Sequence, residues 1–101
     1  MKRVIVRYKV KEDRGEENAE YVRQVFAELA AAAPGGLRYV TFQAEDGVSF
    51  THIASIETAD GSNPLVDTPA FKAFQEELRD RCEVPPTATH VSLVGSYRFI
   101  D

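Results

Sequence analysis

The chain has 101 residues, a length that suits one domain, which we expect to span residues 1–101. Its net charge of −4 and its dispersed Lys and Arg residues argue against a surface for nucleic acid or anionic membrane. A single cysteine, Cys82, excludes an internal disulfide, and the absence of a signal-peptide or membrane-span pattern predicts a cytoplasmic protein.

The N-terminal part of the chain predicts a strand followed by a helix. Apolar and polar residues alternate near residues 3–10, which is typical of a strand with one apolar face. Apolar residues then recur at helical spacing, which predicts a helix near 14–32. Asp13 and Glu16 are spaced as a capping box at its start, and Pro34-Gly35-Gly36 should end it.

Two further strands are predicted on either side of Asp46-Gly47, near residues 37–45 and 48–57. Asp-Gly between alternating segments is a strong hairpin signal, because both central positions of such a turn favour a positive φ. One side of each strand is expected to face the helices. The residues assigned to that side are Val40, Phe42, Ala44, Val48, Phe50, His52, Ala54 and Ile56.

The C-terminal part predicts a second helix and a last strand. Thr68-Pro69 suits an N-cap followed by proline in the first helical position, so we expect a helix near 69–82. Pro85-Pro86 is expected to end this helix. The last strand is predicted near 89–99, with Tyr97 on the side that faces the helices.

The order βαββαβ predicts an α+β, ferredoxin-like fold, with a four-stranded antiparallel sheet and two helices on one face. The other face, half apolar, indicates a partner, although a monomer with scattered surface hydrophobic residues remains the alternative. The residues assigned to this open face are Arg3, Ile5, Arg7, Leu37, Tyr39, Thr51, Ile53, Ser55, His90, Ser92, Val94 and Arg98.

The chain resembles the dimeric α/β-barrel superfamily in its order of elements, in its length and in two segments, FTHIASIE at Phe50–Glu57 and TPAFKAF at Thr68–Phe74. Within it the chain is most similar to antibiotic-biosynthesis-monooxygenase-like proteins. The resemblance implies a homodimer whose two sheets close face to face into an eight-stranded barrel. Family members include cofactor-independent oxygenases of quinols and polyketides, haem-degrading enzymes, isomerases or decarboxylases, and proteins without known activity.

Several positions differ from the residues that oxygenase and haem-degrading relatives use, which are an Asn, a Trp and a His or Tyr around the pocket. The chain has no Trp, and its asparagines are Asn18 and Asn63. Ala70 stands where relatives often have histidine, and His52-x-Ala54 replaces their Glu-x-Trp.

His52 is the candidate catalytic residue, as a general base or a ligand anchor, and it should lie beside Tyr8 under the helices. A buried neutral imidazole bonded to a tyrosine is the alternative interpretation. A pocket is expected between helices and sheet, and no metal or redox cofactor is expected, since the sequence contains no ligand set. The predicted ligand-binding residues are Tyr8, Phe26, Phe42, Phe50, His52, Phe74 and Tyr97.

Three functions remain open for such a domain. It could be a monooxygenase-like enzyme that needs no cofactor and acts on a small aromatic or quinol-type molecule. It could instead bind a small molecule without chemistry, or serve as a structural dimerisation module. RNA binding by the same topology is disfavoured, because the third strand lacks the basic-Gly-aromatic signature.

Overall fold

The computed structural model of the chain describes residues 1–99, and its order of elements confirms the predicted fold. The strands form one antiparallel sheet in the order β2-β3-β1-β4. Within residues 1–99, none of the helices has the length and apolar composition of a membrane-spanning segment. The elements are β1 (Lys2–Val10), α1 (Gly15–Ala32), β2 (Leu37–Gln43), β3 (Ser49–Ile56), the 3-10 turn η1 (Pro64–Asp67), α2 (Pro69–Glu76), α3 (Leu78–Arg81) and β4 (Cys82–Val91).

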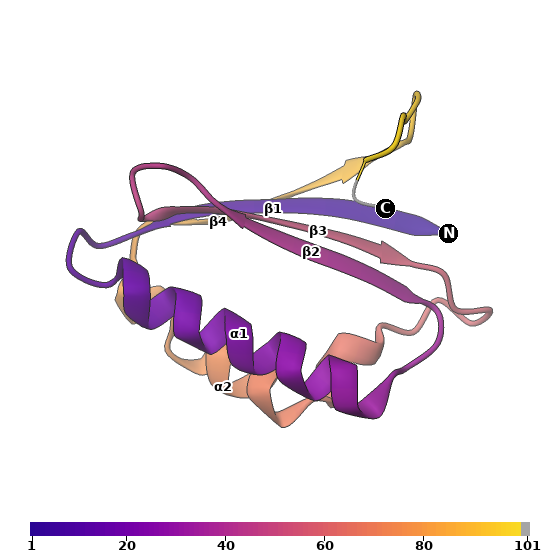
Figure 1. Ribbon diagram of the computed structural model, residues 1–101, viewed down its shortest axis with the longest axis horizontal. Helices are drawn as coiled ribbons and strands as arrows, with labels where there is room; N and C mark the ends of the chain where they lie inside the picture. The colour runs from indigo at the N-terminus through magenta and orange to yellow at the C-terminus, as the bar shows by residue number, and fades with distance from the viewer. Residues whose placement is uncertain (100–101) are drawn as a thin grey trace.

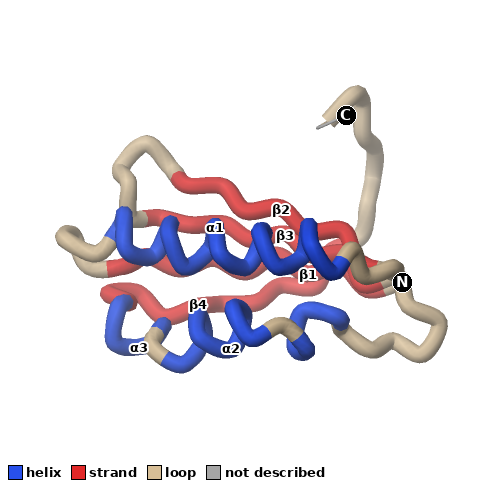
Figure 2. Tube along the Cα trace, turned by 60° about the horizontal axis from the view of Figure 1, so that its bottom comes forward, coloured by secondary structure: helices blue, strands red, loops and turns tan. Residues whose placement is uncertain are grey.

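The helices all lie on one face of the sheet (Figure 1), where α1 and α2 run side by side (Figure 2). The other face is left open, and the segment after β4 rises from the sheet on that side (Figure 1). The core fills the space between helices and sheet, because the apolar faces predicted for β1, β3 and both helices turn toward each other. Its buried members include Tyr8, Val10, Val22, Val25, Phe50, Leu65, Phe74 and Leu78.

The β2–β3 hairpin is present, but its turn differs from the expected one. Gly47 donates its N–H to the Ala44 carbonyl and has φ of 78°, whereas Asp46 is not among the residues with positive φ. The Asp46 carboxylate accepts the N–H groups of Val48 and Ser49. The prediction of two central residues with positive φ was therefore wrong, because the Asp46 side chain holds the turn and only glycine adopts the left-handed conformation.

The side of β2 that faces the helices was assigned wrongly. Tyr39 is paired with Ala54 and Thr41 with His52, and cross-strand partners point to the same face of a sheet. Tyr39 and Thr41 therefore lie under the helices, as does Leu37. Phe42, expected under the helices, is 41% exposed on the open face, where its ring lies 6.2 Å from that of Phe99.

The last strand lies earlier in the chain than predicted. The second helix ends at Arg81 after a break at Glu77, and β4 begins at once, so that Pro85-Pro86 lies inside the strand. Proline is tolerated here because β4 is an edge strand, and the β1–β4 register shifts between Arg7 and Lys9 beside the two prolines.

The altered position of β4 also changes which of its side chains face the helices. His90 is paired with Val4 and Ala88 with Val6, both on the helix side, so His90 was wrongly assigned to the open face. Tyr97 is 81% exposed in the segment after β4, so its predicted place in a strand under the helices was wrong as well.

The two main helices begin differently from the sequence prediction. The capping box at Asp13 and Glu16 is not formed; Arg14 occupies the N-cap position and forms a two-point ion pair with Glu17. At α2, Thr68 and Pro69 take the expected N-cap and first positions. The N–H of Ala70, however, is accepted by Glu28 of α1 rather than by Thr68, so a carboxylate of one helix caps the other.

Candidate functional site

A cavity of about 380 Å³ lies between the sheet and the η1–α2 region, within the size range of small-molecule sites. Strands β1, β2, β3 and β4 each contribute to its wall, as do both helical segments. The side chains that matter for its chemistry are Tyr8, Tyr39, His52, Phe71 and Phe74. A second, more open hollow of about 310 Å³ lies on the other side of Tyr39 and is lined by apolar residues that include Phe26 and Leu29.

His52 lies in the wall of the larger cavity and is 5% exposed. Its Nε2 is 2.7 Å from the Tyr8 hydroxyl, and its Nδ1 is bonded to the Tyr39 hydroxyl and lies 3.0 Å from Thr41 Oγ1. Rings of Tyr8 and Phe74 lie 5.3 and 5.5 Å away, centroid to centroid. Both ring nitrogens are therefore engaged by protein hydroxyl groups.

Burial determines the protonation of this cluster. It lowers the pKa of His52 to about 4, so the imidazole is neutral at pH 7. Burial also raises the pKa of Tyr8 well above its usual range, and that of Tyr39 to about 12 against the opposing effect of a Thr41 hydrogen bond. All three groups are neutral at physiological pH, and both phenols keep their protons.

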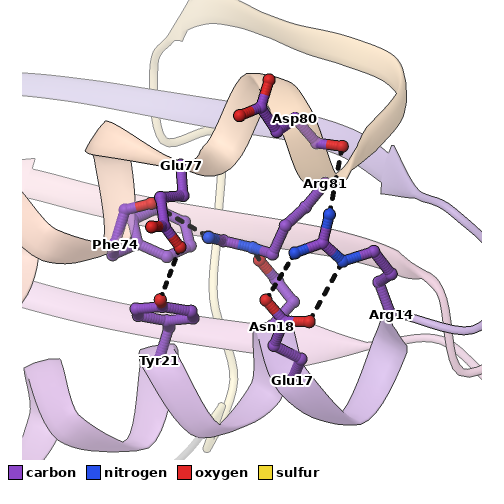
Figure 3. A network of polar contacts seen from close by, with 8 residues as sticks. All are labelled: Arg14, Glu17, Asn18, Tyr21, Phe74, Glu77, Asp80 and Arg81. Carbon is purple, nitrogen blue, oxygen red and sulfur yellow. Dashed lines mark hydrogen bonds and ion pairs between the residues drawn. The ribbon is translucent and has the colours of Figure 1, made fainter.

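The polar contacts continue from Tyr8 through the core to α3. Asn18 Nδ2 donates to the Tyr8 hydroxyl at 2.8 Å, and Arg81 Nε donates to Asn18 Oδ1 at 3.1 Å. Arg81 Nη2 donates to the carbonyl of Phe74 at 2.9 Å (Figure 3). Five side chains, Tyr39, His52, Tyr8, Asn18 and Arg81, thus form one connected line, which we call the polar chain.

Arg81 is fully buried, although its guanidinium forms no ion pair with a carboxylate in residues 1–99. Its charge lies over the ring of Tyr21, 4.3 Å from the centroid, and 5.4 Å from that of Phe74. Tyr21 in turn donates its hydroxyl to Glu77 at 2.8 Å (Figure 3). Aromatic faces and neutral acceptors therefore stabilise the buried charge.

The structure brings together three of the seven side chains predicted to bind a ligand: Tyr8, His52 and Phe74 all line the larger cavity. The predicted contact between His52 and Tyr8 is present. Phe50 is buried against the Tyr8 ring, 5.6 Å away, outside the cavity lining, and Phe26 is stacked on Tyr39 at 5.1 Å in the second hollow. Phe42 and Tyr97 lie on the open side of the sheet, away from both.

Four residues of the site were missed from the sequence: Tyr39, Thr41, Asn18 and Arg81. Tyr39 and Thr41 could have been found from the hairpin, since a turn centred on Asp46-Gly47 pairs residue 41 with 52 and residue 39 with 54. Arg81 follows Phe74 and Leu78 at helical spacing, on the apolar stripe of the second helix. Asn18 precedes Val22 and Val25 on the buried face of α1.

Residues 1–99 contain no group of three or more His, Cys, Asp or Glu side chains that could hold a metal ion. What the arrangement does offer is a largely apolar cavity that contains aromatic rings from the sheet and from α2 and a small number of polar groups, His52 and Tyr39 among them. Since both nitrogens of His52 are engaged, a molecule in the cavity can touch the imidazole ring but would form its hydrogen bonds with the hydroxyl of Tyr39 or Tyr8.

The amino-acid sequence matches a known protein family. Residues 1–77 match the family profile described as antibiotic biosynthesis monooxygenase. No curated protein matches the chain significantly. Among solved structures, 60 chains match this one. The three described below are at most 20% identical to it, so their similarity shows the fold alone.

Three of these structures illustrate the similarity. A protein from Bacteroides thetaiotaomicron, described as a candidate antibiotic biosynthesis monooxygenase, has a TM-score of 0.80 at 15% identity, covering 99% of this chain and 95% of that one. Rv0793 from Mycobacterium tuberculosis has a TM-score of 0.74 at 14% identity, covering 94% and 96%. A variant of SnoaB, a cofactor-independent oxygenase from Streptomyces nogalater, has a TM-score of 0.60 at 20% identity, covering 97% of both chains.

Proposed function

The chain belongs to the antibiotic biosynthesis monooxygenase family, and from that membership we propose that it is a cofactor-independent oxygenase of a small phenol or quinol. The observation that carries the proposal is the cavity of about 380 Å³, whose apolar wall includes Phe71 and Phe74 and whose polar wall includes His52 and Tyr39. A flat ring system suits the first wall, and a ring hydroxyl or carbonyl suits the second.

The proposed reaction balances without any cofactor, because the substrate supplies all the electrons. With 1-naphthol, one atom of O₂ becomes the carbonyl oxygen at ring carbon 4. The other atom leaves as water with the phenolic hydrogen and the hydrogen of that carbon. The product is 1,4-naphthoquinone, so one O₂ is consumed for each quinone formed.

The chain's own residues would bind the substrate and stabilise its electron-rich form. Phe71 and Phe74 would pack against the rings and exclude bulk water. The Tyr39 hydroxyl would donate to the substrate oxygen, where negative charge develops as the phenolic proton passes to the oxygen atom that becomes water. His52, which the sequence suggested as the catalytic residue, then acts through Tyr39 as a positioning residue.

We propose further that residues 1–101 form one domain that works as a homodimer joined through the open faces of the sheets. Ile5 is paired with Ile53, and Ile53 with Val40, so an apolar row crosses three strands of that face. Phe42, Leu93, Val94 and Phe99 add exposed apolar side chains on the same side. A face of this kind is typical of an interface.

Oxygen uptake with air-saturated 1-naphthol tests the proposed reaction, with quinone formation followed in the same sample. We expect uptake above the protein-free rate and equal amounts of O₂ consumed and quinone formed. Tyr39→Phe should lower kcat/KM about tenfold, the effect of one hydrogen bond. Tyr97→Phe, a tyrosine far from the cavity, is the matched control and should leave kcat/KM unchanged.

A second function, non-catalytic binding of the same class of molecule, is favoured by one observation: His52 has no free nitrogen with which to take a proton. Saturable binding of 1-naphthol in the cavity without oxygen uptake would contradict the oxygenase and support this alternative.

A further inference from the structure

The polar chain begins at a group that can only donate hydrogen bonds. A guanidinium has no acceptor atom, so the oxygen of the Asn18 amide must face Arg81 Nε, 3.1 Å away. This fixes which way the amide points. Its Nδ2, at the other end, then donates to the Tyr8 hydroxyl at 2.8 Å (Figure 3 shows the Arg81 end of this line).

The orientation of Asn18 determines the direction of the next bond. The Tyr8 oxygen accepts from Asn18, and its single proton needs an acceptor, because Tyr8 is buried. His52 Nε2 lies 2.7 Å away and can accept it. The opposite direction, from Nε2–H to Tyr8, would leave the Tyr8 proton without an acceptor in the described part of the chain.

His52 must then carry its proton on Nδ1, since a neutral imidazole has one N–H. This N–H faces the hydroxyl oxygens of Tyr39 and Thr41. With its oxygen accepting from His52 and from the Thr41 hydroxyl, whose hydrogen bond opposes the rise of the Tyr39 pKa, Tyr39 still has its own proton to donate. Tyr39 lines the cavity, where a ligand atom could accept.

We propose that Arg81 and Asn18, acting through Tyr8 and His52, hold the Tyr39 hydroxyl as a donor toward the cavity, so that the ligand presents an oxygen acceptor there. This inference deepens the proposed function and rests on it, because it assumes that a small aromatic molecule occupies the cavity. The acceptor is a ketone, quinone or phenolate oxygen. Arg81 and Asn18 are positioning residues, and no part of either needs to touch the ligand.

The direction of the polar chain can be measured as the tautomer of His52, by ¹⁵N NMR of the histidine rings, with His90→Gln to assign the two sets of signals. The wild-type protein should show His52 protonated on Nδ1. Asn18→Asp should move the proton to Nε2, because a carboxylate can only accept from Tyr8, and the Tyr8 oxygen then accepts from His52. A wild-type Nε2–H tautomer overturns the proposal, even if Asn18→Asp fails to fold, and so does an unchanged tautomer in a folded Asn18→Asp protein.

Ligand preference is measured with 1-tetralone and tetralin, two probes of the same shape of which only the first has a carbonyl oxygen. The wild-type protein and the Tyr97→Phe control should bind 1-tetralone about tenfold more tightly than tetralin, the effect of one hydrogen bond. Tyr39→Phe and Asn18→Asp should each lose that preference, with binding of tetralin unchanged.

The outcomes separate this inference from the proposed function. Equal binding of both probes to the wild-type protein, or a preference that survives Tyr39→Phe, would overturn the donor role while leaving the cavity as a binding site. Failure of both probes to bind would contradict the proposed function and the ligand class together, whereas the tautomer measurement decides the direction of the polar chain by itself.

Discussion

His52 shows how one buried residue can be both structural and close to a ligand. Its two nitrogens connect β3 to β1 and β2 through Tyr8 and Tyr39, and its side chain forms part of the cavity wall. Hydrogen bonds between buried polar groups are strengthened by the low polarity around them, and a buried polar group left without a partner is costly. Each member of the polar chain therefore constrains the next. Removing any one of them should affect stability as well as binding.

The buried imidazole should make stability depend on pH in a defined window. The folded pKa of about 4 lies below the unfolded value of 6.5, so the unfolded chain binds the proton more readily. The stabilisation is complete above pH 6.5 and is lost as the pH falls from 6.5 to 4. At roughly 1.4 kcal/mol for each pKa unit, the free energy of unfolding should fall by about 3 kcal/mol. Urea unfolding at several pH values measures this.

His52→Gln supplies the control for that titration. Surface carboxylates whose pKa is lowered by hydrogen bonds, such as Asp46 and the partly buried Glu57, lose their contribution in more acidic solution, and they are present in both proteins. The difference between wild type and variant therefore isolates the histidine. An identical pH dependence in the two proteins would show that His52 is not held neutral by burial.

Among individual residues, the sequence could identify His52 and its contact with Tyr8, because both follow from alternation along adjacent strands. Tyr39 was placed on the wrong face of β2, although the hairpin turn already implied its pairing with Ala54. Arg81 follows Phe74 and Leu78 at helical spacing, but that signal was outweighed because arginine is rarely buried without a carboxylate partner, and Arg81 has none in residues 1–99. Its burial depends on the tertiary contact with Tyr21 and Asn18.

At the scale of elements, the strands with clear alternation of polar and apolar residues and the helices with clear helical spacing were predicted, and their bounds were confirmed within a few residues. The exception is β4, where Pro85-Pro86 suggested a break. Proline excludes a central strand but not an edge strand, and only the topology shows that β4 pairs with β1 alone. Sequence pattern by itself could not make that distinction.

The start of α1 meets the β2–β3 turn so closely that only glycine fits. A Cβ on Gly15 would lie 2.1 Å from the carbonyl oxygen of Gly47, a backbone atom that cannot move without disturbing the turn. Gly15→Ala should therefore lower the free energy of unfolding by about 2 kcal/mol or more, as overpacking does. Urea unfolding at pH 7.5 measures the change.

Gly35→Ala is the matched control for that experiment. No atom of residues 1–99 lies within 4 Å of a Cβ at Gly35, and its φ is not positive, so the variant should be as stable as wild type or slightly more stable. Equal stability of the two variants would mean that helix and turn do not approach each other as described.

At the scale of the whole molecule, the open face of the sheet is the feature that a monomer does not explain, because its apolar side chains would be exposed to solvent. Ile5, Ile53 and Val40 form a row across it, and a stable contact between two such faces should bury on the order of 2,000 Å² in total. Ile53→Asp places an uncompensated charge in the middle of this row and should dissociate or unfold the dimer.

Sedimentation velocity at micromolar concentration distinguishes these cases. We expect a dimer for wild type and for Ala27→Asp, a control that places the same charge on an exposed position of α1. A wild-type protein that sediments as a stable monomer would rule out a barrel made from two sheets, and Ile53 would then be an ordinary surface residue.

The central claim is that a small aromatic molecule binds in the cavity beside His52. Titration of the ¹⁵N-labelled protein with 1-naphthol under nitrogen, which prevents turnover, tests it through the ring-nitrogen signals of both histidines. His52 lines the cavity and His90 is exposed outside it, so one spectrum contains the reporter and its control. The account predicts a saturable shift of the His52 signals with His90 unmoved. Binding that leaves His52 unmoved, or no binding at all, would contradict it.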